Sequence, residues 1–127
     1  MTHRIAIQDE PRFLHVVVTG QNSGHAVRAY LIDIIALCTA RGASHLLIEE
    51  NLAGPSLDSV EVFAALHAAL EHGPTATRYV AVVDTNPGHD PALMRFAETI
   101  GVNRGVNVRT FPGVSAAAQW LAAQLPA

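Results

Sequence analysis

The stretch HLLIEENLAGPSLDSVEVFAAL at 45–66 decides the fold, because it joins a short apolar run to a helical pattern through a turn. HLLIE at 45–49 is bounded by Gly42 before it and by the turn-forming NLAGPS at 51–56 after it, so it predicts a strand buried on both faces. Apolar residues then recur at helical spacing, namely Val60, Phe63, Leu66 and Leu70. A buried strand that leads into a helix is typical of a parallel sheet.

Upstream of this stretch, the chain predicts a hairpin and a helix. RIAIQ at 4–8 alternates apolar and polar residues, and FLHVVVTG at 13–20 follows after Glu10-Pro11, which indicates two antiparallel strands. From 23 to 41, apolar residues recur at steps of three and four, with Gly42 in the place of a C-cap.

Downstream, the strand and helix patterns alternate. YVAVV at 79–83 predicts a second buried strand, and Asp90-Pro91 supplies an N-cap and a first helical residue for a third helix. VNVRTF at 106–111 predicts the last strand, and Ser115 is expected to cap the last helix, SAAAQWLAAQL at 115–125.

The order of elements is therefore β-β-α-β-α-β-α-β-α. It predicts one α/β domain over residues 1–127, with a mostly parallel sheet of four to five strands, helices packed on it and an antiparallel edge strand at the start. A chain of 127 residues that is 50% hydrophobic has enough apolar material for one core.

Charge and composition exclude several functions. All eight basic residues are arginines scattered along a chain of net charge −3, so we expect no nucleic-acid partner. Without lysine, Schiff-base and P-loop chemistry are excluded. The single cysteine, Cys38, is expected to be buried and inert. No apolar run is long enough to span a membrane and the start lacks a signal peptide, so we expect a cytoplasmic protein.

Three segments carry a family resemblance: the stretch at 45–66, YVAVVDTN at 79–86 and the closing VRTFPGVSAAAQWL at 108–121. Together with the order of elements, they resemble STAS domains, in particular the SpoIIAA-like group that is also compared with lipid-binding SEC14 proteins. The resemblance covers nearly the whole chain and implies the fold of anti-sigma-factor antagonists.

The resemblance also implies a regulated serine. In anti-sigma-factor antagonists of this fold, a serine in an Asp-Ser-Ser-Gly stretch at the start of the second helix is phosphorylated to switch binding. Asp58-Ser59 occupies a similar place here, although Val60 and Glu61 follow instead of serine and glycine. Ser56 and Asp58 are also plain N-cap candidates, and helix capping alone explains such residues at a helix start.

Ligands of open parallel sheets bind beyond the carboxyl ends of the strands, a region here called the rim. The candidate binding or phosphorylation residues there are Asn51, Ser56, Asp58 and Ser59, and the further rim candidates are Glu49, Asp84, Asn86 and His89. Glu49, Glu50, Asp84, His89 and Asp90 would supply metal ligands, but they follow no recognised ligand spacing. We therefore expect no metal and no cofactor.

Three functional hypotheses follow. The first is a non-enzymatic interaction or regulatory module whose edge strand and rim at 51–59 bind a protein partner or a second copy of the chain. The second is a small carrier that holds an apolar or acyl ligand between the second helix and the sheet, with Phe63, Leu66 and Leu70 along its wall. The third is a metal-dependent enzyme, which requires Glu49, Asp84 and Asp90 to converge.

Overall fold

The sheet and its helices follow the order expected from the sequence. The computed structural model describes residues 4–10, 12–21, 23–54, 59–70, 77–86, 91–103 and 105–124. The elements are β1 (Arg4–Asp9), β2 (Leu14–Gln21), α1 (Gly24–Arg41), β3 (His45–Ala53), α2 (Ser59–Leu70), β4 (Tyr79–Asp84), α3 (Pro91–Asn103), β5 (Asn107–Phe111) and α4 (Val114–Ala123).

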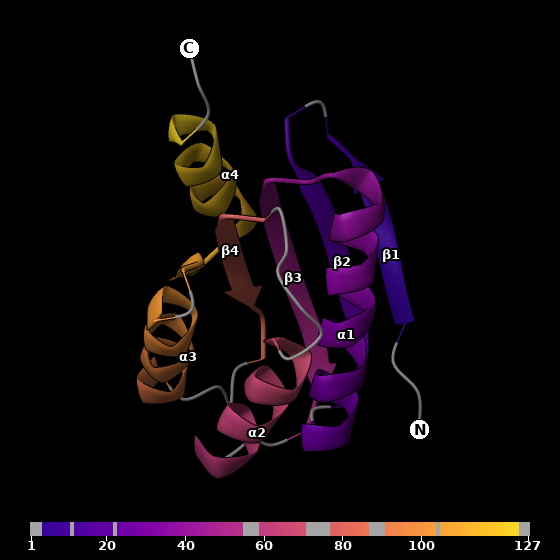
Figure 1. Cartoon of the computed structure of the whole chain (residues 1–127), viewed down its shortest axis with the longest axis vertical. Helices are drawn as coiled ribbons and strands as arrows, with labels where there is room; N and C mark the ends of the chain where they lie inside the picture. Colours follow the sequence, from indigo (N-terminus) through magenta and orange to yellow (C-terminus); the bar gives the residue numbers. More distant parts are fainter. Residues whose placement is uncertain are drawn as a thin grey trace.

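The five strands form one sheet in the order β1-β2-β3-β4-β5. β1 pairs with β2 antiparallel and forms one edge of the sheet, whereas β2, β3, β4 and β5 pair in parallel. Figure 1 shows β1 at one side of the molecule and the parallel strands beside it. The predicted hairpin, the mostly parallel sheet and the antiparallel edge strand are therefore confirmed.

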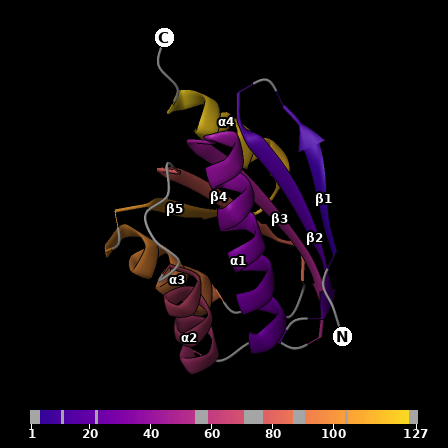
Figure 2. The same cartoon turned by 45° about the vertical axis from the view of Figure 1, so that its right-hand side comes forward.

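Two apolar cores lie on opposite faces of the sheet. On the first face, Tyr30, Ile34 and Cys38 of α1 pack against strand residues that include Val16 and Ile48. On the second face, residues of α4 pack against β3 and β4: the buried members are Ala117, Leu121, Leu47, Ala81 and Val83. We call these the α1 face and the α4 face (Figure 2). Cys38 is buried, as the sequence predicts.

Local signals explain where α1 begins and ends. The Ser23 hydroxyl accepts a hydrogen bond from the Ala26 N–H at 3.1 Å, which satisfies one free donor of the first turn. At the other end Gly42 adopts a left-handed φ of 63°, and the Ala43 N–H donates to the Cys38 carbonyl at 3.0 Å. Glycine tolerates this backbone angle without the steric cost of a Cβ atom.

Two boundaries differ from the expected ones. β3 continues past HLLIE through Glu50, Asn51 and Leu52 to Ala53, because β2 is long enough to pair with it as far as Gln21. The last helix begins at Val114 with Gly113 as its N-cap, so Ser115 lies inside α4 and caps nothing. The Ala117 N–H already donates to the Gly113 carbonyl at 3.2 Å, which places the first turn before Ser115.

Among the described residues, no helix combines the length and the apolar character that a membrane crossing requires.

Candidate functional site

The extra length of β3 places two candidate residues, Glu50 and Asn51, in the sheet beyond the predicted strand, next to Glu49. Side chains alternate between the two faces along a strand, so Glu50 shares the α1 face with Ile48 and Leu52. Glu49 and Asn51 lie on the α4 face, as Leu47 does. The rim is therefore not one cluster, because its carboxylates are divided between the two faces.

On the α4 face, four side chains form a hydrogen-bonded chain that we call the polar row. His15 Nε2 contacts Glu49 Oε1 at 3.2 Å, and the Asn51 amide donates to Glu49 Oε2 at 3.2 Å. The Thr85 hydroxyl lies 2.7 Å from Asn51 Oδ1 and 3.1 Å from the Glu50 carbonyl. The polar row thus crosses from β2 through β3 to the end of β4.

His15 and Glu49 of the polar row are held by hydrogen bonds inside the protein, whereas Thr85 at its end is exposed. His15 is only 5% exposed, and both carboxylate oxygens of Glu49 are already engaged. The pair of His15 and Glu49 becomes an ion pair when the imidazole is protonated. The sequence interpretation missed His15, since only the pairing of β2 with β3 brings it beside Glu49.

On the α1 face, Glu50 and Asp84 lie opposite each other on β3 and β4. Glu50 is set between Ile48 and Leu52 on its own strand, with Val18 as its partner on β2. Burial raises the pKa of Glu50 to about 8, and the neighbouring Asp84 charge adds to the rise. Glu50 therefore holds a proton near neutral pH.

Among the predicted rim residues that the structure describes, Asn86 makes three hydrogen bonds to the ends of β3 and β4. It is buried, and its side-chain amide donates to the Leu52 carbonyl at 3.0 Å and to the Gly54 carbonyl at 2.7 Å. Its own N–H donates to Asp84 Oδ1 at 2.9 Å. Gly54 has a φ of 107°, where a side chain would be strained. Asn86 thus ties the end of β3 to the end of β4, which is a structural role.

The remaining site predictions are not tested. Ser56, Asp58, His89 and Asp90 lie outside the described residues. Ser59 is the first residue of α2, the position that the resemblance assigns to a phosphorylated serine. Phosphorylation of Ser56 or Ser59 stays a prediction.

The convergence required by a metal-dependent enzyme is not met by Glu49 and Asp84. Glu49 pairs with Val83 in the sheet, one residue before Asp84, so the two carboxylates point to opposite faces. Within the described ranges, no three His, Cys, Asp or Glu side chains gather as metal ligands do.

The helix α2 presents apolar side chains to solvent. Val60 is 74% exposed and Phe63 is 49% exposed, whereas Ala65 is buried. The helical spacing of Val60 and Phe63 is typical of a core-facing stripe, but α2 packs mainly on α1 and α3 and both side chains are exposed. We call Val60 and Phe63 the α2 patch. Figures 1 and 2 show α2 near the carboxyl end of β3, so the helix that carries the patch lies beside the rim.

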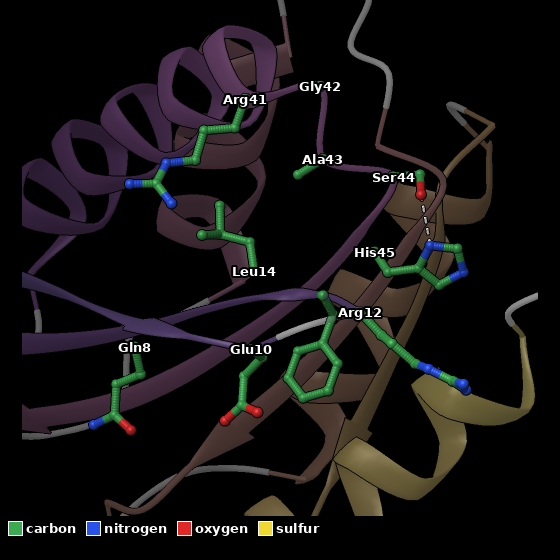
Figure 3. A pocket seen from close by; sticks show the side chains of 10 residues that line it. Gln8, Glu10, Arg12, Leu14, Arg41, Gly42, Ala43, Ser44 and His45 are labelled. Atoms are coloured by element: carbon green, nitrogen blue, oxygen red, sulfur yellow. Dashed lines mark hydrogen bonds between the residues drawn. The ribbon is translucent and has the colours of Figure 1, made fainter.

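A shallow pocket of about 250 Å³ lies at the opposite end of the sheet (Figure 3). The hairpin and the α1–β3 turn line it with charged residues that include Glu10, Arg12 and Arg41. Figure 3 shows the two guanidinium groups pointing in opposite directions, that of Arg12 toward α4, so they do not form a paired anion site. His45 is already bonded to Ser44 at 2.7 Å.

This pocket does not correspond to the apolar site of the carrier hypothesis, which belongs between α2 and the sheet. The α1 face of the sheet near α2 carries the carboxyl groups of Glu50 and Asp84, which are poor neighbours for an acyl chain. The carrier hypothesis stays a prediction.

The chain has a SpoIIAA-like α/β fold: a five-stranded sheet with one antiparallel edge, three helices on one face and α4 on the other. The sequence itself matches no protein-family model and no curated protein. Its fold is similar to two solved structures.

One is an anti-sigma factor antagonist from Mycobacterium paratuberculosis, with a TM-score of 0.55, 19% identity and coverage of 94% of each chain. The other is an uncharacterized protein of the DUF3478 family from Shewanella loihica PV-4, with a SpoIIAA-like fold. For this pair the TM-score is 0.54, the identity is 16%, and the alignment covers 94% of this chain and 93% of the other.

Proposed function

We propose that this chain is a non-enzymatic regulatory module that binds a protein partner through the α2 patch. The observation that carries the proposal is the outward position of Val60 and Phe63 on α2. They lie three residues apart in a helix, so they share one face. Large exposed apolar side chains grouped beside a polar rim are a feature of protein-binding surfaces.

Phe63 is well suited to be the centre of such an interface. Its ring stacks on the His67 ring with a centroid separation of 5.6 Å, and this contact favours one orientation of the aromatic side chain before binding. Rigid aromatic residues lose little entropy on association and are frequent at the energetic centres of interfaces.

The polar row supports a binding role over a catalytic one. Its side chains bond to one another, and His15 is too deeply buried to meet a substrate directly. A catalytic base must come within hydrogen-bond reach of the proton that it removes.

The similar structure from Mycobacterium paratuberculosis supports the class of partner. Its name states that it antagonises an anti-sigma factor, and a protein with that role acts on another protein. We extend this class of partner, a regulatory protein, to the present chain. Ser59 precedes Val60 in the chain, and we propose that its phosphorylation, which adds negative charge, would weaken binding.

The test replaces one exposed apolar residue at a time by glutamate. Partners are cross-linked in the source cells, purified with the unsubstituted chain, identified by mass spectrometry and titrated as pure proteins. Phe63→Glu and Val60→Glu should each weaken binding by about ten- to a hundredfold, the equivalent of losing one buried apolar side chain.

The matched control is Val102→Glu on α3, since Val102 is an exposed valine (56%) on another helix. It should leave the affinity unchanged, and circular dichroism should give the same spectrum for all variants. A partner that binds Phe63→Glu as tightly as the unsubstituted chain would contradict the proposal.

A further inference from the structure

The outer edge of β1 is a second candidate interface, and it does not depend on the α2 patch. β1 is the terminal strand of the sheet, so half of its backbone N–H and C=O groups face away from β2. An edge of this kind is a template for another strand unless proline, charged side chains or a bulge protect it. RIAIQD at 4–9 contains no proline, its only charged residues stand at its two ends, Arg4 and Asp9, and its register with β2 runs without a bulge.

The opposite edge of the sheet, formed by β5, is protected by a side chain of the same molecule. On β5, Glu98 of α3 accepts hydrogen bonds from the Thr110 N–H at 2.7 Å and from the Thr110 hydroxyl at 3.0 Å. A backbone donor of that edge is therefore occupied by a side chain of the same molecule, and pairing with another strand would break the bond.

β1 also carries an exposed apolar side chain. Ile5 and Ile7 pair with Val18 and Val16, so both isoleucines lie on the α1 face. Ile5 packs against the core of that face, but Ile7 remains 41% exposed. A neighbouring strand that covered the Ile7 side chain would remove apolar surface from water, which stabilises the pairing of the two strands.

We propose that two copies of this chain pair antiparallel through their β1 strands, forming one continuous ten-stranded sheet across a twofold axis. The axis passes between the two Ala6 residues, so each Ile5 lies opposite the second copy's Ile7, and each Arg4 lies opposite Gln8. This isologous arrangement closes on itself and leaves neither β1 edge exposed.

The register follows from the faces of β1. Directly opposed residues of an antiparallel pair point to the same face, and a twofold axis perpendicular to the sheet keeps both α1 helices on one side. Residues of the α1 face must therefore oppose one another. Centring the axis on Ala6 matches isoleucine with isoleucine twice, whereas centring it on Ile7 would set Ile5 against Asp9.

The first test measures mass and dimer affinity by sedimentation over a dilution series. The unsubstituted chain should sediment at twice the chain mass of 13.5 kDa. Ile7→Lys should weaken the dimer by about tenfold or more, because it places a charge against Ile5 of the second copy. Val102→Lys, at a comparably exposed site on α3, should leave the dimer intact.

Cross-linking tests the register. In Ala6→Cys the two introduced thiols face each other with Cα atoms about 4.5–5.5 Å apart, which suits a disulfide. In Gln8→Cys the introduced thiols would be about 13 Å apart along the strands and should not join. The native Cys38 is buried, so the unsubstituted chain is the background control.

A monomeric unsubstituted chain, or a dimer unaffected by Ile7→Lys, would overturn the pairing. Preferential cross-linking of Gln8→Cys would overturn the register. Partner binding through the α2 patch is measured separately, so failure of either proposal is visible without the other.

Discussion

At the scale of single residues, Glu50 is a carboxylic acid set into an apolar surface. Ile48 and Leu52 flank it on β3, and Val18 and Asp84 lie on either side of it across the sheet. Burial raises its pKa from an ordinary 4.5 to about 8, with a further contribution from Asp84. Between these two pH values, Glu50 of the folded protein therefore keeps a proton that the unfolded chain has already released.

The raised pKa of Glu50 makes the folded state less stable as the pH rises. Between about pH 4.5 and pH 8 the folded state binds more protons at Glu50 than the unfolded state does, so the free energy of unfolding falls as the pH rises. The slope from this group is at most about 1.4 kcal/mol per pH unit. Urea unfolding of Glu50→Gln should show a flatter pH profile and greater stability than the unsubstituted chain at pH 8.

Asp84→Asn provides a graded control for that experiment. It removes the smaller cause of the raised pKa and leaves the burial, so its profile should fall between the other two. Parallel profiles for Glu50→Gln and the unsubstituted chain would show that Glu50 ionises equally in both states.

The contacts of single residues are the part of the site that the sequence predicts least. The sequence places Glu49, Asn51 and Asn86 at the rim, but it does not predict that Glu49 bonds to His15 or that Asn86 bonds to backbone carbonyls. Those contacts depend on the register between neighbouring strands. The parallel strands are joined through helices rather than by tight turns, so the sequence contains no local signal that sets this register.

At the scale of elements, the sequence predicts most of the architecture, because α1 and the central strands carry clear periodicities and end signals. The predicted boundaries are wrong where pairing or turns elsewhere in the fold, rather than the local sequence, decide the structure. Glu50 and Asn51 are typical of a loop by composition, yet pairing with the long β2 keeps them in β3. Ser115 is a good capping residue, but the turn formed at Gly113 begins α4 before it.

The junction of α3 with β5 depends on the absence of a side chain at Gly101. A Cβ atom there would overlap the Cγ2 atom of Val108. We expect Gly101→Ala to lower the free energy of unfolding by about 1–3 kcal/mol, the usual cost of overpacking, despite the better helix propensity of alanine. Adding Val108→Ala should restore part of the loss, which chemical denaturation of the four variants of a double-mutant cycle measures.

Gly24→Ala is the matched control for Gly101→Ala, because Gly24 also lies in a helix. Its nearest new neighbour would be Glu61 Oε2 at 3.4 Å, an atom of a flexible side chain that can move. Its stability should be unchanged or slightly higher. An equal loss in both variants would show that glycine conformation, rather than contact with Val108, governs the cost.

At the scale of the whole molecule, the two proposed interfaces are separated by α1. α1 contacts β2 on one side and α2 on the other, and both views place it between β1 and α2 (Figures 1 and 2). Pairing through β1 extends the sheet away from α2, so it leaves both copies of the α2 patch uncovered. A dimer of this kind would present two independent partner sites.

This separation predicts the composition of the complex. Native mass spectrometry of the chain with its purified partner should give two copies of each, and Ile7→Lys should convert the assembly to one copy of each. The partner affinity per site should not change, since Ile7 and Phe63 lie on different elements on opposite sides of α1. Phe63→Glu should have the converse effect, an intact dimer without partner. If Ile7→Lys also weakened partner binding by tenfold or more, the two surfaces would be coupled, and the partner would be recognised by the dimer rather than by each α2 patch alone.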